Sequence, residues 1–210
     1  MADADHLLFS RITIKPDNAE LIVIKNPTQN TISLDNNYLS DNPNYYKIQS
    51  ENNLIPFPPT NDFIVKFPPD SYINPGDSIL IAIQSDYKTY YGENFDVDYI
   101  LRDDLIETES GSFGGSSNGR FQDSQECVIL FYWDGNSDSV VKDIDYFLWG
   151  TSPNSQAIDK SDVIGYELDT PFESQSSILV HEDDYTFIRS SLDEQEEDNG
   201  NGITGHNETS

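Results

Sequence analysis

Hydrophobic and polar residues alternate along several short stretches of this chain, and turns rich in Pro, Gly, Asn and Asp separate them. A period of two residues is typical of β-strands, because successive side chains point to opposite faces of a sheet. The segment Asn74-Pro75-Gly76-Asp77 is typical of a type II turn before a strand. No amphipathic helix longer than three turns is indicated. Besides a hairpin at residues 126–150, the pattern predicts strands in residues 7–15, 20–26, 31–34, 38–39, 63–67, 78–84, 178–181 and 185–189.

The most strongly patterned stretch, residues 126–150, predicts a β-hairpin. Its first strand spans residues 127–133 and its second spans 140–149, with a polar turn at 134–138 whose Asp, Asn and Gly residues suit a tight connection. The hairpin contains the single cysteine and both tryptophans of the chain. We expect it to form the centre of a β-sandwich.

In the second strand of this hairpin, strict alternation places Asp143 and Asp145 on one face and Ile144 on the other. Two carboxylates on one face of a strand are about 7 Å apart and suit acid–base hydrolysis only if one of them has a raised pKa in a dry cleft. The alternative is that they bond to loop backbone, pair with Lys or Arg, or help to hold a cation.

The domain organisation follows from the same pattern. Residues 20–26 are apolar on both faces, which predicts a central strand. Short strands separated by Pro and Gly turns predict an all-β sandwich with long loops, covering residues 1–192. From residue 193 the composition changes to six acids without Lys or Arg, so residues 193–210 are predicted to be an acidic, flexible tail or linker.

The charge of the chain narrows the classes of partner. The 210 residues include 11 basic and 38 acidic ones, for a net charge of −27. Phosphate neutralisation needs a basic surface, so nucleic acid is excluded as a partner, and anionic membrane surfaces are disfavoured. Cations and basic proteins are favoured. The alternative is that the charge serves only solubility.

Cysteine and histidine give little support for catalysis. A single cysteine excludes an intrachain disulfide, and Cys127 lies in an apolar strand where it is expected to be a small buried hydrophobe. The histidines His6, His181 and His206 are far from it in sequence. No apolar run reaches the ~18–20 residues of a membrane span. Residues 1–10 lack the basic start and apolar core of a signal peptide, so this start fits a cytoplasmic protein or a mature secreted domain.

The hairpin turn contains a candidate calcium site. Asp134, Asn136 and Asp138 follow a spacing that places side-chain oxygens around a hard cation, and Asp145 stands where an EF-hand loop has its last ligand. That last ligand is normally Glu, and the sixth position, occupied here by Ser139, is normally Gly. These departures favour the alternative, a plain β-turn. Calcium is the one cofactor that the sequence suggests, and none is required.

Aromatic residues suggest a polysaccharide partner as an alternative to a protein partner. An exposed row of aromatic rings can bind sugars, although aromatic residues in β-proteins more often pack in the core. The candidates for such a platform are Tyr45, Tyr46, Tyr90, Tyr91 and Trp133.

The chain resembles bacterial lamin tail domain proteins. The resemblance rests on FSRITIKPDNAELIVIKNPTQNTISLDNNYLSD (residues 9–41), INPGDSILIAI (73–83) and LFYWDGNSDSVVKDIDYFLWG (130–150), in the family's order. It implies an immunoglobulin-like β-sandwich and a non-enzymatic module appended to larger secreted or surface polypeptides. Departures are Lys25 in place of the usual acid and the long insertions at 41–60 and 86–125.

Three functions follow as hypotheses. The first is a non-catalytic interaction or adhesion module of a secreted or cell-surface protein, with a protein or polysaccharide partner. The second is a structural subunit that assembles with itself, in a calcium-dependent manner, by strand addition at sheet edges. The third is a hydrolase that uses Asp143 and Asp145. The ligand, the parent protein and a cytoplasmic location are left open by the sequence.

Overall fold

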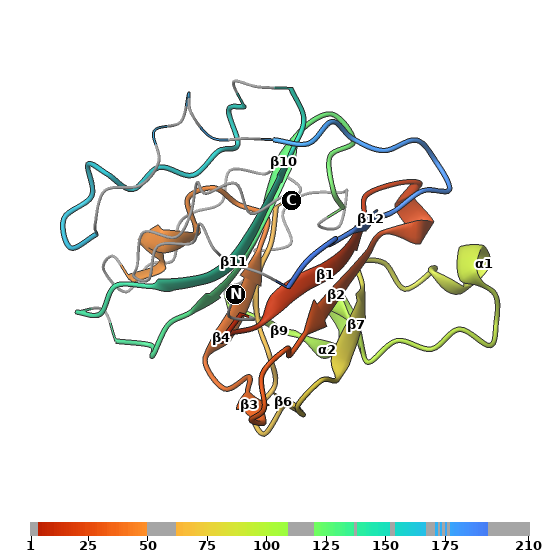
Figure 1. Cartoon of the computed structure of the whole chain (residues 1–210), viewed down its shortest axis with the longest axis horizontal. Helices are drawn as coiled ribbons and strands as arrows, with labels where there is room; N and C mark the ends of the chain where they lie inside the picture. The colour runs from red at the N-terminus through yellow and green to blue at the C-terminus, as the bar shows by residue number, and fades with distance from the viewer. Residues whose placement is uncertain are drawn as a thin grey trace.

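A computed structural model gives the fold and describes residues 4–49, 62–108, 120–136, 138–151, 154–166, 171, 173, 175 and 177–192. These residues form an all-β sandwich of two five-stranded sheets and a two-stranded ribbon, as the alternation predicts (Figure 1). Among them, no helix is long and apolar enough to cross a membrane. The helical elements are α1 (Lys88–Tyr91), α2 (Leu101–Asp104) and the 3-10 turns η1 (Asp17–Ala19) and η2 (Tyr45–Gln49).

The first sheet has the strand order β12-β1-β2-β7-β8. Neighbouring strands are antiparallel except β7 and β8, which are parallel. β2 lies in the middle, so the prediction of a central strand is confirmed. The turn before β7 has Gly76 at φ 75°, a backbone conformation that glycine adopts without strain and that a type II turn requires. The strands are β1 (Leu8–Thr13), β2 (Leu21–Lys25), β7 (Ser78–Ala82), β8 (Tyr99–Ile100) and β12 (Phe187–Ile188).

The second sheet has the order β11-β10-β4-β5-β9 and is antiparallel throughout. The predicted hairpin is confirmed as β10 and β11. However, β11 is the edge strand of its sheet, so the hairpin lies at one side of the sandwich rather than at its centre. The strands are β4 (Asn37–Ser40), β5 (Ile64–Lys66), β9 (Ile106–Glu107), β10 (Glu126–Tyr132) and β11 (Lys142–Trp149), and the ribbon is β3 (Ile32–Ser33) with β6 (Tyr72–Ile73).

The main core lies between the two sheets, and further layers cover their outer faces. η2 and residues 157–166 pack on the outer face of the second sheet, and α1 with the loop after it packs on the outer face of the first. This explains why several strands are apolar on both faces. The central core includes Ile22, Ile24, Ile81, Leu39, Val65, Val128 and Leu130.

Some sequence expectations differ from the structure. Residues 178–181 form only a single bridge, between Ile178 and Trp149, instead of a strand. The two-residue strands β6, β8 and β9 were not predicted, since such short elements have no detectable period. The acidic tail predicted at 193–210 lies outside the described residues.

Candidate functional site

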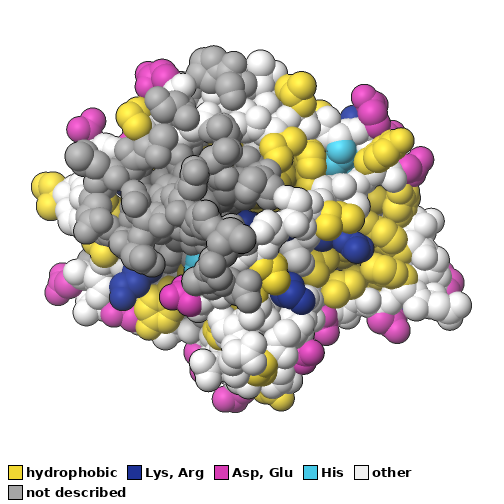
Figure 2. All heavy atoms as spheres, in the orientation of Figure 1, with side chains coloured by type: hydrophobic (Ala, Val, Ile, Leu, Met, Phe, Trp, Pro, Cys, Tyr) yellow, Lys and Arg dark blue, Asp and Glu magenta, His cyan; other side chains and the backbone are white. Residues whose placement is uncertain are grey.

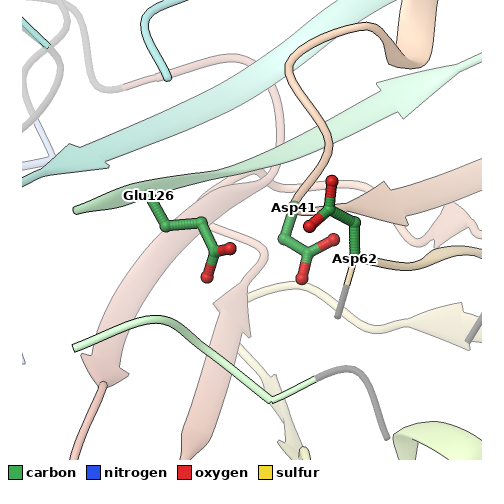
Figure 3. A group of neighbouring side chains, drawn as sticks. All are labelled: Asp41, Asp62 and Glu126. Carbon is green, nitrogen blue, oxygen red and sulfur yellow. The ribbon is translucent and has the colours of Figure 1, made fainter. Parts of the chain in front are cut away.

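Three buried carboxylates meet at one end of the second sheet. Asp41 directly follows β4, Asp62 lies just before β5, and Glu126 begins β10. One oxygen from each lies within 4.8 Å of the others, and Figure 3 shows the three groups turned toward one another. In the part of the chain that the structure describes, no other trio of His, Cys, Asp or Glu side chains is this close. We call this trio the carboxylate cluster.

Strand pairing creates the cluster. Ser40, the last residue of β4, pairs with Ile64, the first residue of β5, and with Ile129, three residues after Glu126 in β10. The adjoining residues Asp41, Asp62 and Glu126 then face a common volume, although they are far apart in sequence.

Hydrogen bonds orient each carboxylate in the cluster. The main-chain N–H of Phe63 donates to Asp41 Oδ1, and that of Gln122 donates to Glu126 Oε2 at 2.8 Å. Asn42 Nδ2 donates to Asp62 Oδ2 at 2.9 Å. The second oxygen of Asp41, Oδ2, is buried and accepts no hydrogen bond. The cluster therefore has at least one fixed oxygen whose bonding capacity is unused.

The electrostatics of the cluster oppose full ionisation in the absence of a cation. Burial raises the pKa of Asp41 well above its usual value, and the nearby charges of Glu126 and Asp62 raise it further. Burial also raises the pKa of Glu126, against the opposing effect of the Gln122 N–H. These are the effects expected when carboxylates are brought together away from water.

Cys127 lies next to the cluster and is fully buried. Burial, and then the charges of the three carboxylates, raise the pKa of its thiol well above the usual value. The thiol Sγ lies 3.7 Å from the main-chain carbonyl of Asp41, to which it donates. A protonated, buried thiol is a poor nucleophile, so Cys127 acts as a small packing residue, as predicted.

Another buried carboxyl, Glu20, lies just before β2. Burial raises its pKa to about 10, and the charges of Asp17 and Glu126 contribute in the same direction. The Phe121 N–H donates to Glu20 Oε1 at 3.0 Å, whereas Glu20 Oε2 is buried without a hydrogen bond. The segment that leads into β10 is thus tied to Glu20 through Phe121 and to Glu126 through Gln122.

The hairpin acids that the sequence singles out do not form a pair. β11 contains a bulge, because Leu130 pairs with Asp145 while the next residue, Phe131, pairs with Asp143. Opposed residues share a face, so the two acids point to opposite faces of the sheet. The prediction that they share a face is therefore wrong, since a bulge adds a residue that strict alternation does not include.

Asp143 lies on the outer face of the second sheet in a buried ion pair. Lys160 Nζ contacts Asp143 Oδ2, and both side chains are fully buried. The Tyr45 hydroxyl donates to Asp143 Oδ1 and lies 3.1 Å from Lys160 Nζ. This triad links η2, β11 and the segment that contains Lys160 across the outer layer.

Asp145 lies on the inner face and is also paired. Arg189 Nη2 lies 2.9 Å from its Oδ1 and 3.1 Å from its Oδ2, and the Phe9 N–H donates to Oδ2. These contacts link β11 to β1 and to the chain after β12. Both hairpin acids therefore bind basic residues of the fold, which was one of the alternatives drawn from the sequence.

The hairpin turn uses its side chains locally. Asp134 Oδ1 accepts the Asn136 N–H at 2.9 Å, Asp134 Oδ2 accepts the Ser139 hydroxyl at 2.9 Å, and Asn136 Oδ1 accepts the Asp138 N–H at 3.0 Å. Asp145 is bound to Arg189 inside the sheet and is not part of this turn. The four-residue calcium site is therefore not assembled, while calcium binding by the turn alone stays a prediction.

The proposed aromatic platform is divided between two faces. Tyr45 and Tyr46 are buried in the layer over the second sheet, and Trp133 packs against that layer. Tyr90 and Tyr91 belong to α1, which packs over the first sheet. The five rings do not form one surface, because the intervening sandwich separates them.

One indirect signal for the carboxylate cluster is present in the sequence. Glu126 directly precedes the strand predicted at 127–133, and Asp41 lies two residues after the strand predicted at 38–39; an acid near a strand end is a candidate for a site at a sheet end. Their convergence depends on strand order, which the alternation pattern does not contain.

No family model matches the chain, and no curated protein matches it. Among solved structures, the chain is similar to a DUF4876 family protein from Bacteroides thetaiotaomicron, with a TM-score of 0.41 and 13% sequence identity. The match covers 61% of this chain and 42% of that structure, so this chain spans less than half of the other protein's length. The resemblance to lamin tail domains stays a prediction.

Proposed function

We propose that the chain is a non-catalytic interaction module, a lamin-tail-like β-sandwich within a secreted or cell-surface protein. The observation that carries this proposal is a set of three exposed hydrophobic side chains in the segment that leads into and includes β12, the edge strand of the first sheet. Leu179, Tyr185 and Ile188 lie close together in sequence and are 70%, 68% and 65% exposed. We call these three residues the edge surface.

The edge surface lies where a partner can reach it. Ile188 belongs to β12, the last strand of the first sheet, and pairs with Arg11 of β1. Tyr185 closes a turn through a hydrogen bond from its N–H to the carbonyl of Glu182. Figure 2 shows hydrophobic side chains at the surface over β12 and β1. Single exposed hydrophobic residues are normal on a protein surface, so the proposal rests on the presence of three of them in one short segment at a sheet edge.

The rim of the edge surface indicates the chemistry of the partner. Glu182, Asp183 and Asp184 are exposed and lie between Leu179 and Tyr185 in sequence. Protein interfaces combine apolar and aromatic anchors with a polar rim, and complementary charge speeds and directs association. A partner with an apolar groove and a basic rim fits this arrangement and the net charge of −27.

The ion pairs of the hairpin support a non-catalytic role. Asp143 and Asp145 lie on opposite faces, and each binds a basic side chain of the fold. A hydrolase of this kind needs two carboxylates that face one substrate. The two hairpin acids do not meet that requirement.

Peptide binding tests the proposal. The full chain is applied to an array of peptides in which aliphatic or aromatic residues are flanked by Lys and Arg. A triple Ser variant of the edge surface should lose binding, and the matched control Ile164→Ser, which alters a side chain that is 96% exposed elsewhere, should retain it. Equal binding by both variants contradicts the proposal. So does turnover of an ester, phosphate or glycoside substrate that is abolished by Asp143→Asn.

A second candidate function, self-assembly, is favoured by the position of β12. This strand pairs with β1 on one side and ends the first sheet, so a strand from another copy can extend the sheet there. Sedimentation velocity over a range of concentrations, with and without calcium, measures it. Concentration-dependent dimers that the triple edge-surface variant abolishes support self-assembly, and a monomer under all conditions excludes it.

A further inference from the structure

We infer that Asp41, Asp62 and Glu126 bind a single calcium ion that ties together the ends of β4, β5 and β10. The inference rests on the geometry of the carboxylate cluster and is independent of the proposed interaction function. It also differs from the calcium site predicted in the hairpin turn.

The spacing of the oxygens fits one shared cation. Calcium binds oxygen ligands at 2.3–2.6 Å, so two oxygens on one ion are at most about 5 Å apart. One oxygen of each carboxylate lies within 4.8 Å of the other two. The three groups come from three different strand ends and point inward (Figure 3). A central ion can therefore contact all three without rearrangement of the strands.

An unused oxygen supplies an independent indication of a ligand. Asp41 is fully buried, and its Oδ2 accepts no hydrogen bond, whereas its Oδ1 is held by the Phe63 N–H. A buried carboxylate oxygen without a partner is costly, because it has lost its hydration and gained nothing in return. A cation at the centre of the cluster gives this oxygen a ligand.

The negative charge of the cluster also favours a bound cation. Three ionised carboxylates in a buried volume repel one another, because little water is present to screen their charges. A divalent cation reverses the sign of that interaction and favours the ionised forms. The donors that orient the acids, such as Asn42 Nδ2 on Asp62, already favour ionised carboxylates over protonated ones.

The ligand chemistry selects calcium among divalent cations. The cluster offers carboxylate oxygens alone, which suit hard cations and not zinc or copper, whose preferred ligands include nitrogen and sulfur. Magnesium requires near-ideal octahedral geometry at shorter distances and retains several waters. Calcium accepts the irregular geometry that results when ligands come from three separate strand ends.

Calorimetric titration of the full chain, first stripped of metal with a chelator, tests the site. Wild type should bind one calcium ion at the cluster, and Glu126→Gln and Asp41→Asn should each lose that binding. The matched control is the double variant Asp134→Asn, Asp138→Asn, which alters the exposed turn and should retain the cluster's binding. Loss of all binding in the turn variant, with normal binding by Glu126→Gln, overturns the inference.

Thermal unfolding of the wild type keeps the test decisive if a cluster variant fails to fold. Calcium at about 100 times its Kd should raise the midpoint by about 5–11 °C, since an ion bound only by the folded state stabilises it. Magnesium at the same concentration should raise it much less. An unchanged midpoint in millimolar calcium, or an equal rise with magnesium, contradicts the assignment.

Discussion

The triad of Lys160, Asp143 and Tyr45 gives the sharpest prediction about stability. Lys160→Met removes the cation and leaves the carboxylate of Asp143 buried, with the Tyr45 hydroxyl still donating to it. Met has a similar length and no charge, so the volume of the side chain is largely kept. The substitution therefore isolates the loss of the charge from the loss of packing.

The expected loss of unfolding free energy follows from the burial of the ion pair. Both side chains have 0% exposure, so water cannot solvate Asp143 when Lys160 is lost. Removing one partner of a buried ion pair typically costs about 3–5 kcal/mol of unfolding free energy. Lys160 also lies over the rings of Tyr45 and Tyr166, at 5.7 and 5.5 Å from their centroids, which adds a smaller cation–π loss. For a domain of this size, the unfolding midpoint should fall by about 6–20 °C.

Urea denaturation followed by tryptophan fluorescence measures the effect. The control Lys88→Met breaks a pair with Asp96, which is 85% exposed, and should leave the midpoint nearly unchanged. A triple variant, Tyr45→Phe, Asp143→Leu, Lys160→Met, makes the triad apolar and should regain most of the lost stability, because no buried charge is left unpaired. The reasoning is refuted if Lys160→Met costs no more than the control, or if the triple variant is as unstable as the single one.

Three further predictions concern other buried positions. Because burial raises the pKa of Glu20 from 4.5 to about 10, the folded state keeps a proton between these pH values that the unfolded state releases. The unfolding free energy should therefore fall as pH rises through that range. Glu20→Gln should reduce this pH dependence by up to about 1.4 kcal/mol per pH unit, as measured by urea denaturation at pH values from 6 to 9. Arg189→Met removes the guanidinium that pairs with buried Asp145 and should cost about 3–5 kcal/mol by the same assay, unless Asp145→Leu accompanies it. Gly150→Ala should lower the unfolding free energy by at least about 1–3 kcal/mol, because the φ of Gly150 is 120° and an added Cβ would overlap Gln125 Cβ. Thermal unfolding measures this loss, and a stability equal to that of the wild type would contradict this backbone conformation.

The alternation of apolar and polar residues along the chain predicts much of the fold. Residues 20–26 are apolar on both faces, and β2 is the central strand with a covering layer on each side. The turn at Pro75 and Gly76 and the hairpin at 126–150 also lie where the sequence predicts them. These features depend on local periodicity and turn chemistry, which a single sequence records directly.

The features that cannot be predicted from the sequence are those that depend on pairing between distant segments. The bulge in β11 moves Asp143 and Asp145 to opposite faces, and only the register with β10 shows it. Lys160 lies outside every predicted strand and Arg189 ends the strand predicted at 185–189, but no local pattern shows that they bind these acids. The carboxylate cluster likewise requires the order β10-β4-β5, and no local pattern specifies that order.

A crystal structure of the full chain grown in calcium chloride, with anomalous diffraction data, tests the central claim most directly. The account predicts one calcium ion within 2.3–2.6 Å of an oxygen from each of Asp41, Asp62 and Glu126, with Asp41 Oδ2 among its ligands. A crystal in which calcium occupies the turn at Asp134, while the cluster carboxyls hydrogen-bond to one another without an ion, would contradict it.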